Sequence, residues 1–304
     1  MSTYSPLQSK SLCDVLREEL GGWCHDPLFT PTDGMDALPE AFMKPNNNGW
    51  NTDVDLSKNI IYGIVVDTVK DNNNSVTVIG RDRATSNRIK ITGDAVILTV
   101  PLQIIRQMNI NLPIEMQKAL ANITYEAAAK MILQCKTRFW QKDVGQGGFT
   151  RTSLPIGQIH YPDWPGSGFT EKDRGLLVVY SWAHDAIIFG SQPKRHALAN
   201  VVEQIKHIHP EIEEQFEVGT VQTWCSDQFA QGAFAALERS SYLTAMKALV
   251  TPTPRLYLAG EALSWSNGWI QGALFSGLMQ AFNFTYYNES KIVFNPCDFM
   301  CSPI

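Results

Sequence analysis

The strongest candidate for chemistry in this chain is a carboxylate followed by a glycine-rich helix start. Glu261 ends a short apolar strand that begins at Leu256, and Gly268 opens a helix after a short loop. The first turn of a helix presents free N–H groups and a partial positive charge, which suit an anionic ligand or a ring that becomes negative on reduction. Gly268, Gly272 and Ala273 allow a close approach of the backbone. An ordinary capped helix is the commoner explanation of these residue types alone.

A lysine within an apolar strand is the second candidate. Lys130 belongs to the run from Ala129 to Cys135, where a lone cation is costly unless it has a partner or a function. A lysine that extends to solvent is otherwise the commoner case. His160 alone is typical of a surface or satisfied histidine, and Trp224 alone is more typical of a core than of a ligand wall.

The elements that must position these residues begin with a predicted hairpin. Asp71 to Asn74 have side chains that suit a tight turn, and the segments on either side are rich in β-branched residues. Pro101 ends the pattern because proline has no N–H to donate to a sheet. Strands are predicted over Ile60 to Val69, Ser75 to Ile79, Arg88 to Thr92 and Ala95 to Val100.

Further strands and helices are predicted on both sides of this region. A short helix is expected from Leu12 to Leu20, strands over Ala129 to Cys135 and Gly175 to Trp182, and a helix near His196 to Ile208. The helix after Gly268 has apolar or small residues at i, i+3 and i+4 spacing, which predicts one apolar face. These are Ile270, Ala273, Leu274, Gly277, Leu278 and Ala281.

Composition excludes several classes of function. With 304 residues, 44% hydrophobic and 18% charged, the chain has material for one large or two ordinary globular domains. A net charge of -5 provides no broad basic field, so we expect no nucleic-acid partner. No apolar run approaches the roughly 18 to 20 residues of a membrane span. The six cysteines lack paired metal spacing, so we expect no metal site.

Several ordered motifs resemble those of the flavin amine oxidase family. Tyr257 to Glu261, followed by Gly268 to Ala273, is similar to the C-terminal FAD motif of that family, and the Gly-Trp-Ile form is typical of its L-amino-acid oxidases. Other blocks agree in order and spacing, and the resemblance extends to about Tyr287. They are Asp33 to Pro39, Val96 to Pro101, Ala129 to Met131 leading to Phe139-Trp140, Gly147-Gly148 leading to Ile159 to Pro162, and Trp224 to Gly232.

The resemblance implies FAD as the cofactor and assigns residues to it. Lys130 matches a lysine that holds a water beside the reactive flavin nitrogen, and it is the predicted catalytic residue. Val66 matches a residue whose backbone binds the adenine end, Trp224 an indole near the flavin, and Glu261 a carboxylate at the ribityl or phosphate region. The turn that faces the flavin comprises Gly268, Trp269, Ile270, Gln271, Gly272 and Ala273.

The resemblance also assigns the substrate side. Tyr180 matches a tyrosine that binds the substrate carboxylate, the Gly268 carbonyl a group that receives its amine, and Trp269 an aromatic wall. The side-chain pocket is lined by His160, Trp182 and Phe234. Bulky aromatic surfaces there favour large apolar or aromatic side chains, and a pocket packed shut is equally consistent with them.

The substrate class can be narrowed by one comparison within the family. Monoamine oxidases enclose a simple amine between two tyrosines, and the matching positions here are Ala235 and Trp269. The cage is therefore broken. Together with Tyr180 and the Gly-Trp-Ile motif, this favours an amino acid over a simple amine or polyamine.

The family's nucleotide-binding motif is not found in this sequence. No G-x-G-x-x-G follows a strand, and Gln271 and Gly272 depart from the acidic or polar residues that the family commonly has after Gly-Trp-Ile. The expected fold is α/β with mixed α+β character: the C-terminal part of a FAD-binding amine oxidase fold interleaved with a mixed-sheet substrate domain. The expected divisions are a remnant of the substrate or helical region at 1–45, FAD-binding portions at 46–101 and 251–287, a substrate-binding domain at 102–250, and a tail at 288–304.

The resemblance implies oxidative deamination of an L-amino acid to a 2-oxo acid, with ammonia and hydrogen peroxide, and a role in amino-acid catabolism. Molecular oxygen is the second small-molecule partner, and oligomeric state is left open. Two alternatives remain: a non-catalytic remnant that serves as an interaction module, and a monoamine or polyamine oxidase. Family members are often secreted, but the first ten residues have no signal-peptide core, so the compartment is left open.

Overall fold

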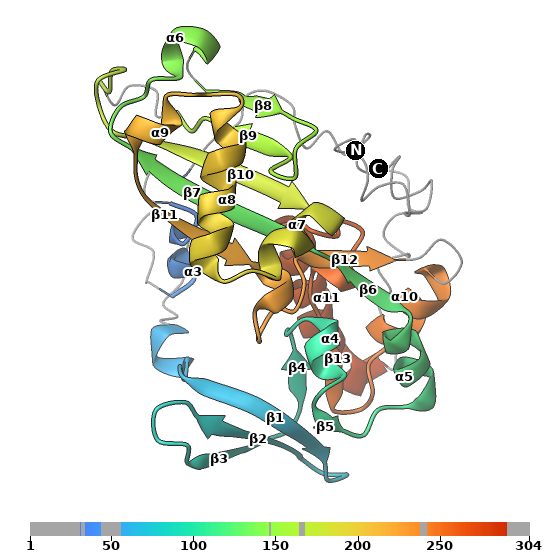
Figure 1. The fold of residues 1–304 in the computed structure, drawn as a ribbon. Helices are drawn as coiled ribbons and strands as arrows, with labels where there is room; N and C mark the ends of the chain where they lie inside the picture. Colours follow the sequence, from blue (N-terminus) through green and yellow to red (C-terminus); the bar gives the residue numbers. More distant parts are fainter. Residues whose placement is uncertain are drawn as a thin grey trace, which may run out of the picture.

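The computed structural model describes residues 31, 34–43, 56–145, 147–163, 168–237 and 242–290. The predicted helix from Leu12 to Leu20 lies outside the described residues, as does most of the predicted tail. The described residues form mixed and antiparallel sheets flanked by helices, as Figure 1 shows. The predicted mixed α/β class is therefore confirmed.

The predicted hairpin forms the start of a four-stranded sheet. Its turn is closed by a hydrogen bond from the Asn72 N–H to the Ser75 carbonyl at 2.8 Å, and Asn73 has a φ of 71°. The first strand starts later than predicted, since Gly63 has a φ of +76° and breaks the extended run before Ile64. In the order β3-β2-β1-β5, the strands are β3 (Arg88–Gly93), β2 (Val76–Asp82), β1 (Ile64–Asp71) and β5 (Asn109–Ile110).

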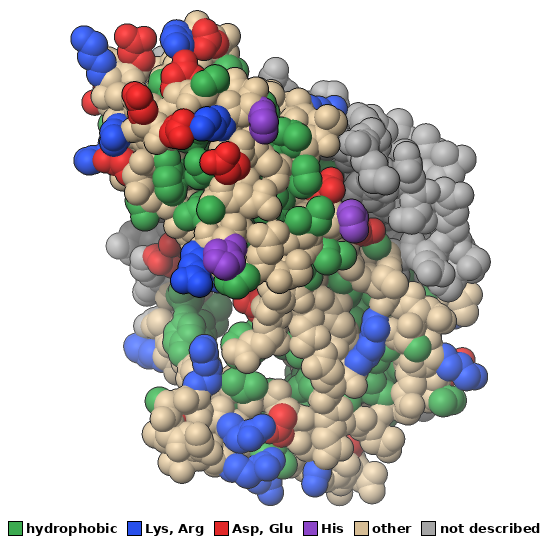
Figure 2. Space-filling view, in the orientation of Figure 1, with side chains coloured by type: hydrophobic (Ala, Val, Ile, Leu, Met, Phe, Trp, Pro, Cys, Tyr) green, Lys and Arg blue, Asp and Glu red, His purple; other side chains and the backbone are tan. Residues whose placement is uncertain are grey.

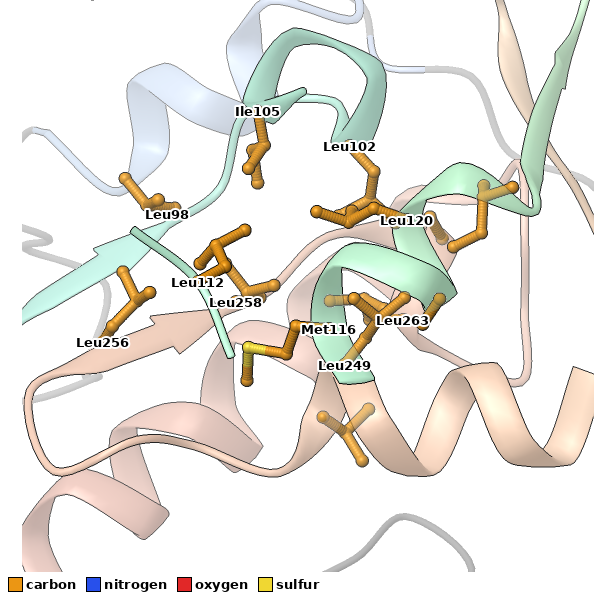
Figure 3. Packing of buried hydrophobic residues seen from close by; sticks show 14 of the residues in the cluster. Leu98, Leu102, Ile105, Leu112, Met116, Leu120, Leu249, Leu256, Leu258 and Leu263 are labelled. Carbon is orange, nitrogen blue, oxygen red and sulfur yellow. The ribbon is translucent and has the colours of Figure 1, made fainter. Parts of the chain in front are cut away.

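A parallel strand pair lies in the first hydrophobic core. Strands β4 (Val96–Leu98) and β13 (Leu256–Leu258) pair in parallel, although they are far apart in the sequence. Every residue of β13 is buried, and Leu98 and Leu258 pack with leucines from the surrounding helices (Figure 3). These helices are α4 (Leu102–Ile105), α5 (Ile114–Ala121) and α10 (Tyr242–Val250).

A five-stranded antiparallel sheet carries the second core. Met131 and Leu133 alternate with Lys130 and Ile132 along one strand, so apolar side chains collect on one face. In the order β11-β7-β10-β9-β8, the strands are β11 (Phe216–Thr223), β7 (Ala128–Cys135), β10 (Gly175–Trp182), β9 (Gln158–His160) and β8 (Phe149–Arg151).

Short helices cover that apolar face of the sheet. The buried residues Ala186, Ala197 and Val201 belong to the same core as Met131 and Leu133, and α7 and α8 contribute them (Figure 1). The helices of this region are α6 (Gln141–Val144), α7 (Ala183–Gly190), α8 (Lys194–Lys206) and α9 (Ile212–Gln215). The opposite face of the sheet, which we call the open face, carries Lys130 and Ile132.

A strand pair and the loop before the last helix join the two cores. Strands β6 (Ile123–Glu126) and β12 (Phe234–Leu237) are antiparallel, and β12 packs beside the 3₁₀ turn η3 (Glu261–Leu263). The last helix begins at Ile270, two residues after Gly268, whose φ of +78° is not helical. The remaining elements are α3 (Ala37–Ala41), η1 (Leu56–Asn59), η2 (Trp224–Ser226) and α11 (Ile270–Ser290).

Helix α11 has the predicted periodicity, but its apolar face points outward. Its buried side carries polar residues: Gln280 Nε2 donates to the Val250 carbonyl at 3.0 Å, and Ser276 Oγ accepts from the Gly260 N–H at 3.2 Å. These bonds to distant backbone groups explain why polar residues are buried here. The outward stripe, which we call the α11 stripe, consists of Ile270, Leu274, Leu278, Phe282 and Tyr286, and each of these residues is 42 to 58% exposed.

The predicted domain boundaries stay a prediction, but the two cores group the chain in a definite way. Residues 102–123 and 245–250 contribute to the first core, together with β4 and β13. The second core draws its residues from 127–221. Of the helices in the described part of the chain, none is both long and apolar enough to cross a membrane.

Candidate functional site

Lys130 lies on the open face of the sheet among aromatic rings. Its Nζ is 4.8 Å from the centroid of the Tyr180 ring and 5.9 Å from that of the Trp224 ring. The register pairs Lys130 directly with Tyr180 on β10, so the two side chains share a face, and Trp224 follows the end of the other neighbouring strand. Among the described residues, no carboxylate forms an ion pair with Lys130. Lys130 is exposed, and its ammonium group lies beside these two rings.

A continuous aromatic wall runs from this lysine to the loop before α11. The Tyr180 and Trp182 rings meet edge to face with centroids 5.0 Å apart, and the Trp182 and Phe234 rings do so at 6.5 Å. Phe234 then lies against Gly268, since a Cβ built on Gly268 would be 3.5 Å from the Phe234 Cβ. The wall thus joins Tyr180 and Trp182 of the five-stranded sheet, Phe234 of the β6–β12 pair and Gly268 of the loop, which are all sequence-predicted site residues.

His160 stands at the other side of the open face. Its Nε2 is 2.9 Å from Gln158 Oε1, and its ring stacks on Phe149 with centroids 5.3 Å apart. Burial lowers the pKa of His160, and the positive charge of Lys130 lowers it further. The imidazole is therefore neutral at neutral pH, which suits a pocket wall better than a proton donor.

Tyr180 is poised to act as a neutral hydrogen-bond donor. Burial raises the pKa of its hydroxyl above the usual value of 10.0. The group therefore keeps its proton throughout the physiological range and can donate it to a carboxylate. This agrees with the role that the sequence assigns to Tyr180, which stays a prediction.

The Glu261 carboxylate binds two backbone N–H groups of the chain itself. Oε1 accepts from the Ala235 N–H at 3.1 Å, and Oε2 accepts from the Gly268 N–H at 2.7 Å. Its backbone carbonyl also accepts from Ser264 Oγ at 2.8 Å and from Asn267 Nδ2 at 3.1 Å. The loop that was predicted to face the flavin is thus organised by bonds within the chain.

Contacts within the chain require glycine at position 272. A Cβ at this position would come within 2.2 Å of both Ser264 Oγ and the Ser266 carbonyl oxygen. The first turn of α11 therefore packs directly against the loop from Ser264 to Ser266. A role for Gly272 beside the cofactor stays a prediction.

The start of α11 presents a surface beside this loop. Trp269 is 39% exposed and Gln271 is exposed, while Ala273 is half-buried. Gln271 lines a mainly apolar groove of about 540 Å³. The lining residues of this groove are Ser264, Trp265, Ser266, Gln271, Gly272, Leu274, Phe275 and Leu278.

Val66 is not part of this assembly. It lies on β1 beside an irregularity in the register between Val66 and Thr68, and it packs against the first core. Its predicted contact with the adenine end of FAD stays a prediction. In the described part of the chain, no group of three or more histidine, cysteine, aspartate or glutamate side chains is placed to hold a metal ion.

Several contributors to this region are absent from the sequence-based set. Gln158 and Phe149 share the open face with His160 because they occupy paired positions on β9, β10 and β8. Strand alternation could have identified Gln158, two residues before His160. The sequence around Ser264 and Asn267 does not predict their role, because their hydrogen bonds to the Glu261 carbonyl form only when the loop turns back on itself.

Comparison with known proteins places this geometry in a family. Residues 17–282 match the family described as flavin containing amine oxidoreductase. A putative L-amino-acid oxidase of Bacillus subtilis (strain 168) is 28% identical over 277 residues, which cover 90% of this chain and 55% of that protein. An L-amino-acid oxidase of Echis ocellatus is 28% identical over 288 residues, covering 88% of this chain and 54% of that protein.

The fold agrees with that of a solved structure. A triple mutant of putrescine oxidase superposes with a TM-score of 0.61 at 20% identity, covering 73% of this chain and 48% of that one. This likeness concerns the fold alone. The chain spans about half the length of the curated relatives it matches.

Proposed function

Because the chain belongs to the family of flavin containing amine oxidoreductases, we propose that it forms the substrate-binding and C-terminal flavin-facing part of an L-amino-acid oxidase. The product of the proposed reaction is a 2-oxo acid, with ammonia and hydrogen peroxide. Curated relatives with the same printed activity support this assignment at 28% identity.

The observation that carries the proposed substrate class is the position of the positively charged Lys130 Nζ beside the Tyr180 and Trp224 rings on the open face. A cation on the wall of a binding site attracts a carboxylate and repels a second ammonium group. An amino acid brings the carboxylate, whereas a diamine brings the second ammonium. Ala235, which is buried at one of the two positions of the monoamine oxidase cage, leaves that cage incomplete.

The residues near the start of α11 fit the flavin end of FAD. This helix of 21 residues begins beside an apolar groove, and its first N–H groups suit a ring that becomes negative on reduction. In the proposed site the turn from Gly268 to Ala273 and the Trp224 indole would hold the ring. Bound FAD would supply the redox chemistry, accepting hydride from the substrate and passing electrons to oxygen.

The protein side chains would bind and orient the substrate. The neutral Tyr180 hydroxyl would donate to the carboxylate, and the Gly268 carbonyl would accept from the amine in its neutral form. Trp182 and Phe234 would contact the side chain of the substrate, with the neutral His160 at its far end. Lys130 would hold a water at the flavin, as the resemblance implies, while its charge favours an anionic ligand.

The exposed surfaces of this chain support the proposal that a nucleotide-binding segment completes the enzyme. The α11 stripe is a row of large apolar side chains at four-residue spacing, which soluble proteins rarely leave uncovered. The space-filling surface is hollowed between the sheet of β1 to β3 and the elements above it (Figure 2). A segment with the pyrophosphate-binding turn would cover such surfaces.

Two other functions remain as alternatives. A monoamine or polyamine oxidase is compatible with the family, whose description specifies no particular amine. A non-catalytic module is supported by the lack of a G-x-G-x-x-G turn in this sequence.

Peroxide release distinguishes these functions. The chain would be joined to the part of the Bacillus subtilis relative that it does not match, loaded with FAD and assayed with L-phenylalanine, benzylamine and putrescine. We expect L-phenylalanine to exceed putrescine by roughly tenfold or more in kcat/KM, equivalent to about 1.4 kcal/mol. Faster release with putrescine would assign the protein to the amine and polyamine oxidases, and a folded, flavin-loaded protein that releases no peroxide would support the non-catalytic module.

A further inference from the structure

Glu261 connects two parts of the candidate site that are distant in sequence. One carboxylate oxygen accepts the N–H of Ala235 in β12, and the other accepts the N–H of Gly268 in the loop before α11. Hydrogen bonds to an ionised acceptor are about twice as strong as neutral ones. The carboxylate therefore fixes the distance between the strand and the loop.

The two bonded residues flank the contact that closes the aromatic wall. Phe234 immediately precedes Ala235, and its ring lies against Gly268. Gly268 has a φ of +78°, which glycine adopts without steric strain. The bond from the Gly268 N–H to Glu261 holds this turn against the strand.

The backbone of Glu261 braces the same loop from within. Its carbonyl accepts from Asn267 Nδ2 and Ser264 Oγ, and Ser264 Oγ in turn accepts from the Ser266 N–H at 3.1 Å. Asn267 and Ser264 are 5% and 1% exposed. Each of these bonds joins two groups of the chain itself.

We infer that Glu261 is a positioning residue, which holds Gly268 against Phe234 by accepting two backbone N–H groups and so sets the width of the site before FAD binds. This role differs from the direct contact with the ribityl or phosphate region that the family resemblance implies for Glu261. Its consequence for substrate binding rests on the proposed function. The positioning itself does not, and it can be tested without FAD.

The test is amide hydrogen exchange of the full chain without FAD, read at single residues by fragmentation mass spectrometry. Glu261→Gln keeps one acceptor oxygen and places an NH₂ group against the other backbone N–H. We expect one of the Ala235 and Gly268 amides to exchange on the order of tenfold faster in Glu261→Gln, and both to do so in Glu261→Ala, as loss of a hydrogen bond to a charged group predicts.

Controls separate local loosening from general destabilisation. The Ala259 N–H, which donates to the Leu98 carbonyl at 2.9 Å, should keep its rate in every variant. Glu115→Gln removes a carboxylate that is exposed on α5 and paired with Lys118, and it should change neither the Ala235 nor the Gly268 amide.

Three results would overturn the inference. The first is a Gly268 amide that exchanges at the unprotected rate in the wild-type chain, which decides the matter even if the variants do not fold. The second is unchanged exchange at Ala235 and Gly268 in both Glu261 variants. The third is equal acceleration at Ala259, which would make the effect global. Weaker FAD binding by Glu261→Gln with unchanged exchange would instead support a direct contact with the cofactor.

Discussion

The two faces of the five-stranded sheet differ sharply in what lies against them. On the covered face, Met131, Leu133, Leu177 and Val179 are fully buried beneath α7 and α8. On the open face, which the same strands form, Ile132 is 38% exposed and Lys130 lies among aromatic rings. One face forms the second core, and the other carries the residues of the proposed substrate site.

Helix α11 repeats this contrast on a smaller scale. Its inner side packs Gly272 against the loop from Ser264 to Ser266 and ties Gln280 to the backbone of Val250. Its outer side is the α11 stripe. Both elements therefore pack one side against the chain and offer apolar or charged side chains on the other, where the proposed nucleotide-binding segment would pack.

The largest expected effect is on the free energy of unfolding, and it distinguishes neighbouring residues on the two faces of β7. Leu133→Ala should destabilise the chain by about 2 to 5 kcal/mol, because it leaves a cavity in a closed core. Ile132→Ala removes a partly exposed side chain and should cost less than about 1 kcal/mol. Chemical denaturation of both variants measures the difference. Similar losses from both would mean that the open face is packed against something in this chain.

The next effect compares two glycines on opposite sides of α11. Gly272→Ala should destabilise by about 1 to 3 kcal/mol, since its Cβ would meet the Ser266 carbonyl oxygen. Gly277→Ala meets nothing within 4 Å and should stabilise by about 0.5 to 1 kcal/mol through helix propensity. Thermal unfolding measures whether each substitution lowers or raises stability. Loss of stability from both substitutions would contradict the proposed packing of α11.

A smaller effect is expected on the pKa of His160, on the open face, but not on that of His209. Lys130→Met should raise the pKa of His160 toward its ordinary value, because the positive charge of Lys130 lowers it now. Burial lowers the pKa of His209, with no contribution from Lys130, so this pKa should stay the same. Proton NMR titration of the two imidazoles measures both values. An unchanged His160 would show that Lys130 points elsewhere.

The lowered His160 pKa also fixes the sign of a pH effect on stability. Below the ordinary histidine value of 6.5, the unfolded chain binds the proton more readily than the folded chain, so stability falls as the pH decreases toward the folded pKa. Lys130→Met should make this acid-dependent loss smaller. Urea unfolding of the wild type and the variant at several pH values between 7 and 5 tests the difference.

The smallest expected effect on stability concerns the α11 stripe. Leu278→Gln should change the free energy of unfolding by less than about 0.5 kcal/mol, yet it should reduce the fluorescence of a bound apolar dye. Ile187→Gln, at an exposed site on α7 away from the stripe, serves as the matched control and should reduce the fluorescence less. Equal reductions by both would contradict a continuous apolar surface along α11.

Local patterns predicted much of the fold. The strand from Gly175 to Trp182 and the hairpin turn at Asn72 and Asn73 follow from β-branched runs and turn residues, which act over a few positions. The direction of α11 did not follow, because periodicity marks a face without saying which side is buried. Ser276 and Gln280 are buried through bonds to Gly260 and Val250, which only the tertiary structure brings close.

The sequence predicted the residues of the candidate site better than the hydrogen bonds between them. Family motifs identified Lys130, Tyr180 and Phe234, and the structure places them on one continuous wall. The bond from the Ala235 N–H to Glu261 joins residues 26 positions apart, and neither residue type suggests it. Partners of this kind depend on how two sheets meet, which sequence spacing does not encode.

The proposal that this chain forms one part of a flavin site and a nucleotide-binding segment the other is tested most directly by visible absorption. The spectrum would be measured after incubation with FAD and desalting. It would be recorded for this chain alone and for the chain joined to the part of the Bacillus subtilis relative that this chain does not match. We predict flavin bands near one equivalent per chain for the joined protein and weaker bands or none for the chain alone. A joined protein that is folded but colourless would contradict the claim that these open surfaces form half of a flavin site.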